Sequence, residues 1–290
     1  MPLLQSSHWP FLIDVYFFLG GVAGGAFVIA TVAALVNTRA YRDVVRAGYY
    51  LALAALIPCP VLLIVDLGVP ARFMNMMTTF NPQSPMSMGS WALGVFGVCV
   101  ALAVLFTILE DLGKAANLSG PRRIVGVVGG AAGFFVAAYP GVLLGATARP
   151  LWIDGHALGA LFLAVGASTA AAAIALILTV AGRARGDGAT AIRRLTVLAL
   201  LVQGLSLVIF IVAVQGAGSP ASDRALALLM SGPFKLTFWV GAVIVGMVAP
   251  LLLGLADLRR PSSALGALTA VMVLVGGFLV KYVIMAAGQV

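Results

Sequence analysis

Residues 11–36 read FLIDVYFFLGGVAGGAFVIATVAALV, an apolar run whose one charged residue is Asp14. A helix needs about 20 apolar residues to cross the hydrocarbon core of a bilayer, so this run is long enough for one transmembrane helix. No basic residue precedes the run, and no small-residue cleavage site follows a short apolar stretch. We therefore expect it to remain as a membrane helix rather than to be removed as a signal peptide.

The rest of the chain repeats this pattern. Seven further apolar runs cover residues 47–67, 88–110, 122–146, 157–181, 194–215, 233–257 and 264–286. The runs are continuous rather than alternating in polarity, which excludes a β-barrel, and the connections between them are too short for a soluble domain. We predict an all-α integral membrane protein with about eight transmembrane helices in two four-helix bundles, forming one domain over residues 1–290.

The composition supports the same fold class. Hydrophobic residues make up 62% of the chain and charged residues only 9%, whereas soluble domains carry about a quarter charged residues. The net charge of +8 comes from residues scattered over short loops, not from one basic face of the kind that binds nucleic acid. The expected surroundings are a lipid bilayer, with no nucleic-acid partner.

The basic residues also predict an orientation. Loops one, three, five and seven carry twelve of the 17 Lys and Arg residues, namely Arg39, Arg42, Arg46, Lys114, Arg122, Arg123, Arg183, Arg185, Arg193, Arg194, Arg259 and Arg260. The positive-inside rule places these loops in the cytoplasm. Both termini are then expected on the outward side, which in a bacterium is the periplasm. The protein is expected in the cytoplasmic membrane of a bacterium or an archaeon, as a multi-pass protein.

Thiols and imidazoles are scarce. Cys59 and Cys99 both lie inside apolar runs, and His8 and His156 are the only histidines. An iron–sulfur cluster takes about four thiolates, and two histidines near helix starts do not suggest a transmembrane b-type haem. We expect no haem, cluster or other metal site in this chain, so any redox metal would belong to a partner.

Glycine and proline indicate how the helices pack. Gly20, Gly21, Gly24 and Gly25 form small-xxx-small pairs on the first helix, a pattern that lets two helix backbones approach closely. Pro58, Pro60, Pro140 and Pro250 lie inside predicted spans and are expected to kink or locally unwind them.

Polar residues gather on the predicted outward side. The candidates there include His8, Trp9, Asp14, Tyr16, Asp66, Arg72, Tyr139, Arg149, Trp152, Asp154 and His156. Ionisable groups in a bilayer are costly and invite a functional explanation. Asp14 needs a partner or a proton most clearly, because it lies on an apolar, glycine-packed helix. On the other side, Glu110, Asp111 and Asp257 are interpreted as solvated caps or ion pairs at helix ends.

Structural explanations also fit several of these residues. Trp9, Tyr16 and Trp152 suit an interfacial belt of aromatic side chains, and Asp66 and Arg72 suit an ion pair at the neck of a loop. The Tyr139 hydroxyl, beside Pro140, can serve either a ligand carbonyl or a freed backbone group. A site with proton-exchanging groups, aromatic walls and access from lipid nevertheless suits quinone chemistry, because a quinone exchanges two protons with its two electrons.

Two stretches carry a family resemblance. Asp66–Phe73 (DLGVPARF) and Phe80–Trp91 (FNPQSPMSMGSW) resemble the signature of the NrfD/polysulfide-reductase membrane-subunit family. Phe18–Gly25, Tyr139–Leu144, Ala146–Trp152 and Gly276–Val283 support the resemblance, which extends over nearly the whole chain.

The resemblance implies a quinone-binding anchor of about eight helices, with menaquinone or ubiquinone bound near the periplasmic face against helices one, two and four. It also implies two partners, a four-cluster ferredoxin-like iron–sulfur subunit and a molybdopterin-type catalytic subunit. Tyr139 matches the family's quinone-contacting tyrosine, and Asp14 and Tyr16 fall in its polar stretch on helix one. Asp14, where characterised members often have Asn or His, and Pro140, where a small polar residue is expected, depart from the family pattern.

The hypothesis is therefore a membrane subunit that passes electrons between the quinone pool and an iron–sulfur partner. The expected catalytic residues are Asp14 and Tyr139, and the expected quinone-binding residues are His8, Asp14, Tyr16, Asp66, Arg72, Tyr139 and Arg149. The alternatives are a structural anchor, and a proton-translocating subunit without quinone chemistry of its own. The terminal substrate, the direction of electron flow and the quinone type depend on more than this chain.

Overall fold

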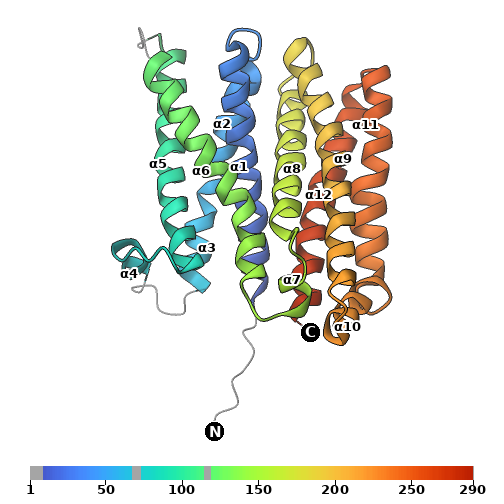
Figure 1. Cartoon of the computed structure of the whole chain (residues 1–290). Helices are drawn as coiled ribbons and strands as arrows, with labels where there is room; N and C mark the ends of the chain where they lie inside the picture. The colour runs from blue at the N-terminus through green and yellow to red at the C-terminus, as the bar shows by residue number, and fades with distance from the viewer. Residues whose placement is uncertain (1–8, 67–72, 114–118, 290) are drawn as a thin grey trace.

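The computed structural model describes residues 9–66, 73–113 and 119–289 and shows a bundle of long, roughly antiparallel helices (Figure 1). Within these residues, eight helical spans are long and apolar enough to cross a membrane, as predicted. The spans are formed by α1 (Phe11–Asn37), α2 (Arg42–Leu56) with α3 (Pro58–Asp66), α5 (Pro85–Asp111), α6 (Ser119–Gly145), α8 (Leu158–Val180), α9 (Asp187–Gly216), η2 (Thr237–Val248) with α11 (Ala249–Arg259), and α12 (Ser263–Gln289).

Three short helices lie between spans at the end of the bundle that also holds Phe11 and Gln289 (bottom of Figure 1). They are α4 (Phe73–Thr78), α7 (Pro150–Ile153) and α10 (Pro220–Met230). We call this end the terminal end, and the opposite end, which carries the predicted cytoplasmic loops, the basic end.

The spans form two groups of four, as predicted. The first group contains α1, α2–α3, α5 and α6, and the second contains α8, α9, η2–α11 and α12. Helices α1 and α8 join the groups by packing along each other. Helix α8 is the most enclosed of the described spans, with 72% of its most apolar window buried, because it has neighbours from both groups.

The glycines of α1 make this packing possible. A Cβ atom added at Gly25 would lie 2.5 Å from the carbonyl oxygen of Gly166 on α8, and one added at Gly24 would lie 3.2 Å from the Cβ of Ala137 on α6. Neither position has room for a larger side chain. The predicted close helix crossings are therefore present on two sides of α1.

The prolines act in different ways. The second span breaks at Ile57, directly before Pro58, because a proline removes a backbone donor and restricts the residue that precedes it. Helix α6 instead continues through Pro140. In the seventh span a π-helical segment ends two residues before Pro250, a local irregularity for which the sequence pattern gives no signal.

Candidate functional site

Helix α1 places a carboxyl group inside the terminal end of the bundle. The helix begins at Phe11, after the extended residue Pro10, so Asp14 falls in its first turn. A helix N-terminus favours a carboxylate electrostatically, but the surroundings of this one are apolar. Asp14 is 4% exposed, and its Oδ1 atom has no hydrogen-bond partner among the described residues. Asp14 is thus a buried acid with unused hydrogen-bonding capacity.

Tyr139 is a second buried polar residue of the terminal end. Its ring stacks on Phe135 of the same helix, with ring centroids 5.6 Å apart, and its hydroxyl group reaches α5. A Cβ atom added at Gly89 would lie 2.5 Å from that hydroxyl, so glycine at position 89 makes the space that the phenol occupies. The hydroxyl group therefore lies at the contact between α5 and α6.

Three helices bring polar side chains together around Tyr16. This residue is 7% exposed, and its phenol lies close enough to Tyr139 of α6 and Cys59 of α3 to interact with both electrostatically. Two of the predicted site residues, Tyr16 and Tyr139, are therefore within electrostatic range of each other. Asp14 precedes Tyr16 by two residues, which places it about half a turn around α1, on a different face of the helix.

An apolar cavity lies next to the contact of Tyr139 with α5, between α2–α3 and α5. Its volume is about 290 Å³, and its walls include Leu56, Ile57, Pro60, Leu63, Phe73 and Ser90. Ser90 follows Gly89, the residue that contacts Tyr139. Ile57 is 60% exposed on the outer surface of the bundle, so the cavity reaches the lipid-facing side. Its size and lining suit an apolar ring.

Other predicted site residues are placed differently. Asp66 is exposed at the end of α3, and Arg149 is half-buried directly before α7. Neither forms an ion pair with a described residue. His8 and Arg72 lie outside the described residues, so the predicted Asp66–Arg72 pair stays untested.

Tyr16 and Trp152 are buried inside the protein and so are not part of an aromatic belt at the membrane interface. Tyr16 is enclosed by the bundle, and Trp152 is 1% exposed and donates a hydrogen bond from its indole nitrogen to the carbonyl oxygen of Ile284 at 3.0 Å. Trp152 thus ties α7 to α12 inside the protein.

The sequence reasoning missed Lys281, which lies within the Gly276–Val283 stretch. Lys281 is 1% exposed and donates a hydrogen bond to the carbonyl oxygen of Phe17 at 2.7 Å. Its ammonium group also lies 5.0 Å from the ring centre of Phe162 and interacts electrostatically with Cys59, the thiol next to Tyr16. One signal was available, because Lys281 is the only charged residue of α12.

The acids of the basic end form ion pairs. Glu110 pairs with Arg122, and Asp111 with Arg46. Asp257 is not solvated, because it is 2% exposed and pairs with Arg193 at 3.0 Å. Within the described residues there is no group of three His, Cys, Asp or Glu side chains able to hold a metal ion.

Comparison with known proteins gives a consistent family. Residues 3–290 match a family model described as polysulphide reductase, NrfD. The protein is 28% identical to one of the chains of the polysulfide reductase of Wolinella succinogenes, over 97% of its own length and 94% of that relative. It is 26% identical to an NrfD homolog of Haemophilus influenzae, with the same coverage of each protein. It is also 21% identical to a selenate reductase subunit of Mesobacillus selenatarsenatis, over 87% of its own length and 67% of that relative.

Proposed function

The chain belongs to the NrfD polysulphide reductase family, and we propose that it is the quinone-reactive membrane subunit of a respiratory reductase complex. Two of its relatives are named as parts of reductases, one for polysulfide and one for selenate. Eight apolar spans make this chain the part of such a complex that lies in the bilayer. Its role is to exchange electrons between the quinone pool and a partner subunit.

The observation that carries the proposal is the arrangement at the terminal end. Two buried phenols, Tyr16 and Tyr139, and the buried acid Asp14 lie at this end, and Tyr139 contacts Gly89, the residue before Ser90 in the wall of an apolar cavity that reaches the lipid-facing surface. A quinone is an apolar ring that arrives through the bilayer, and its two carbonyl oxygens need hydrogen-bond donors. Phenols supply such donors, and a buried carboxyl group supplies a proton.

The proposed reaction assigns a role to each residue. Reduction of a quinone takes two electrons and two protons and gives the quinol, and oxidation of the quinol is the reverse. Tyr139 donates a hydrogen bond to one quinone carbonyl oxygen. Asp14 passes one of the two protons to or from the bound ring, as a general acid or base does in an enzyme site, and water at the nearby aqueous face supplies or takes the other. Tyr16 positions the phenol of Tyr139 and lines the path of the proton between Asp14 and the quinone.

The remaining assignments follow the same proposal. The electrons pass to or from a four-cluster ferredoxin-like iron–sulfur subunit, which connects to a molybdopterin-type catalytic subunit. This partner docks at the terminal end, near the quinone, on the periplasmic side of the cytoplasmic membrane. Menaquinone and ubiquinone both suit the cavity. Asp66 and Arg149, together with His8 and Arg72, are proposed to bind the quinone or line its approach.

The test uses the complete complex purified from native membranes. We expect Asp14→Asn to lower quinone-dependent turnover by about tenfold or more, since proton transfer by a placed group contributes about 10²–10⁴-fold. We expect a loss of about tenfold or more for Tyr139→Phe as well, since it removes a hydrogen-bond donor to the oxygen on which charge develops. Turnover with a soluble artificial electron donor, which bypasses the membrane subunit, should not change. Tyr50→Phe is the matched control, because Tyr50 lies on α2 and is 39% exposed.

One other result would overturn the proposal, and one would report on assembly instead. If both variants keep full quinone-dependent turnover, the chain is a structural anchor, or translocates protons without quinone chemistry at this site. If activity with the soluble donor falls in parallel, the substitutions damage assembly of the complex rather than the site.

A further inference from the structure

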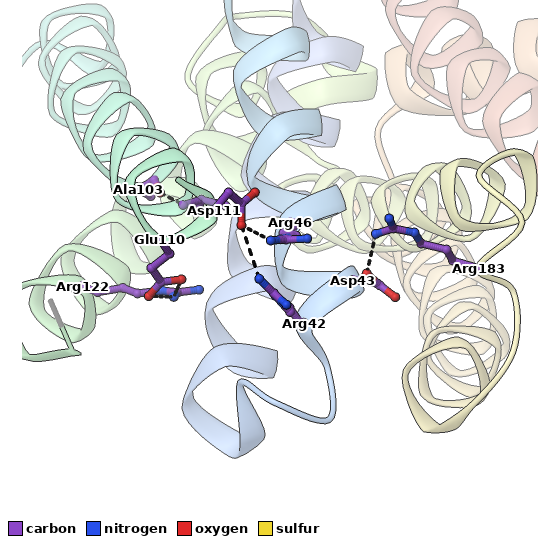
Figure 2. Close-up of polar contacts among 9 residues, drawn as sticks. Arg42, Asp43, Arg46, Ala103, Glu110, Asp111, Arg122 and Arg183 are labelled. Atoms are coloured by element: carbon purple, nitrogen blue, oxygen red, sulfur yellow. Dashed lines mark hydrogen bonds and ion pairs between the residues drawn. The ribbon is translucent and has the colours of Figure 1, made fainter. Parts of the chain in front are cut away.

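Four arginines surround a cavity at the basic end of the bundle, far from the proposed quinone site. The cavity has a volume of about 300 Å³ and lies between the α1–α2 connection, the end of α5 and the start of α6. Its lining includes Arg39, Arg42, Arg46, Thr107, Glu110 and Arg122. Figure 2 shows Arg42 and Arg46 of α2 beside Asp111 of α5, and Arg122 of α6 beside Glu110 of α5.

The acids of this region do not balance its cations. Glu110 accepts two hydrogen bonds from Arg122, each 2.5 Å long. Asp111 pairs closely with Arg46 and lies 3.7 Å from Arg42. Two carboxylates thus face four guanidinium groups, and Arg39 has no ion-pair partner in the part of the chain that the structure describes. The cavity keeps an excess positive charge.

Arg122 shows unused binding capacity. Its side chain is only 10% exposed, and its Nε atom has no hydrogen-bond acceptor among the described residues. Beneath it, the Tyr49 phenol interacts with the guanidinium group and lies 3.3 Å from the Thr31 hydroxyl group. A buried donor without an acceptor is costly. An anion in the cavity would supply both a hydrogen-bond acceptor and the missing negative charge.

The surroundings indicate the kind of anion. Guanidinium groups bind phosphate through paired hydrogen bonds. The cavity lies where the apolar spans end, and strongly exposed apolar side chains are close by in sequence, among them Val36 at 68% and Ile124 at 67% exposed. A ligand in this cavity would have the arginines at one of its ends and the lipid-facing surface of the helices at the other.

We propose that this cavity binds the phosphate headgroup of an anionic phospholipid, such as phosphatidylglycerol or cardiolipin. Arg39 and Arg42, the outer cations, make the first contact with the phosphate, and Arg46 and Arg122 lie behind them. The acyl chains follow the outer faces of α5 and α6. Basic pockets between transmembrane helices are a known class of site for anionic headgroups. This site does not depend on the quinone proposal.

The test measures bound lipid by native mass spectrometry of the delipidated complex, titrated with phosphatidylglycerol or phosphatidylcholine in detergent micelles. We expect phosphatidylglycerol to bind and phosphatidylcholine to bind far more weakly. The double variant Arg39→Gln/Arg42→Gln should weaken phosphatidylglycerol binding by about tenfold or more, because it removes two charge-assisted hydrogen-bonding groups. The matched control, Arg259→Gln/Arg260→Gln, removes the same charge from the basic end outside the cavity and should change binding little.

A second variant acts in the opposite direction. Glu110→Gln removes the acid that occupies Arg122, so we expect it to tighten phosphatidylglycerol binding. Equal losses in the two arginine double variants would overturn the proposal, since they would show general attraction to the basic end. Competition by millimolar inorganic phosphate as effective as that by the lipid would also overturn it, and would assign the site to free phosphate. Weaker binding in Glu110→Gln would show that the cluster is only structural.

Discussion

The ammonium group of Lys281 on α12 donates a hydrogen bond to the backbone carbonyl oxygen of Phe17 on α1, 2.7 Å away. The two residues are far apart in sequence, and their contact joins the first and last spans of the protein. No carboxylate forms an ion pair with Lys281 among the described residues. The carbonyl oxygen and the face of Phe162 are the polar and aromatic groups that stabilise this buried cation.

The first prediction concerns the space that Lys281 occupies. A Cβ atom added at Gly21 would lie 2.6 Å from the Lys281 nitrogen but 3.5 Å from the Cα of Gly166. Gly21→Ala should therefore cost more stability when Lys281 is present, because the ammonium group must move away from the Phe17 carbonyl oxygen, than in a Lys281→Met background. A double-mutant cycle of unfolding in mixed micelles should give a coupling free energy of roughly 0.5–3 kcal/mol. Equal effects in both backgrounds would show that α8, not the ammonium group, restricts position 21.

The second prediction concerns the ion pair between α9 and α11. Arg193 and Asp257 are 3.0 Å apart, with side chains 16% and 3% exposed. Asp257→Asn leaves the arginine without its counter-charge in a buried place, so we expect a loss of about 3–5 kcal/mol in the free energy of unfolding. The control is Asp43→Asn, which breaks the exposed pair with Arg183 and should cost about 1 kcal/mol or less. Similar losses in the two variants would contradict the distinction between a buried and an exposed pair.

The third prediction concerns the crossing of η2 and α12. A Cβ atom added at Gly276 would lie 2.8 Å from the carbonyl oxygen of Gly246, so Gly276→Ala must push the two helices apart. We expect a loss of about 1–3 kcal/mol from overpacking, measured as the free energy of unfolding in mixed micelles. At Gly97 the nearest atom to an added Cβ is Leu56 Cδ2, 3.9 Å away. Gly97→Ala should therefore leave stability nearly unchanged, and an equal loss there would refute the packing argument.

The fourth prediction concerns orientation. The twelve basic residues of loops one, three, five and seven predict that these loops are cytoplasmic and that the carboxyl terminus is periplasmic. Alkaline phosphatase fused to the carboxyl terminus should be active, whereas the same reporter inserted after Gly186, in a loop of the basic end, should be inactive. The reverse pattern would place the proposed quinone site at the cytoplasmic face.

Most of the fold could be predicted from the sequence, because each span is a separate, continuous apolar run. The limits of the spans were less accurate. The second span begins at Arg42 rather than near residue 47, since its first turn carries charged side chains that an apolar run does not include. The π-helical segment at Thr237–Val248 could not be predicted, because nothing in the apolar run distinguishes it from an α-helix.

From the sequence, the candidate site could be predicted only as a set of residues at the same depth in the membrane. That Tyr16 and Tyr139 are neighbours depends on how α1 packs on α6, and the glycines that permit this packing do not specify a rotation about the helix axis. Lys281 and the Arg193–Asp257 pair were missed for a related reason. A charge inside an apolar run is visible in the sequence, but its partner on another helix is not.

The most direct test of the quinone proposal is a cryo-electron-microscopy map of the complete complex, saturated with quinone. We predict density for the quinone ring in the cavity between α2–α3 and α5, within hydrogen-bonding reach of Tyr139. A larger apolar groove of about 590 Å³ lies between the two groups of spans, along Ile29, Phe134 and Leu195. Ring density in that groove, with lipid or no ligand beside Tyr139, would contradict the proposed site.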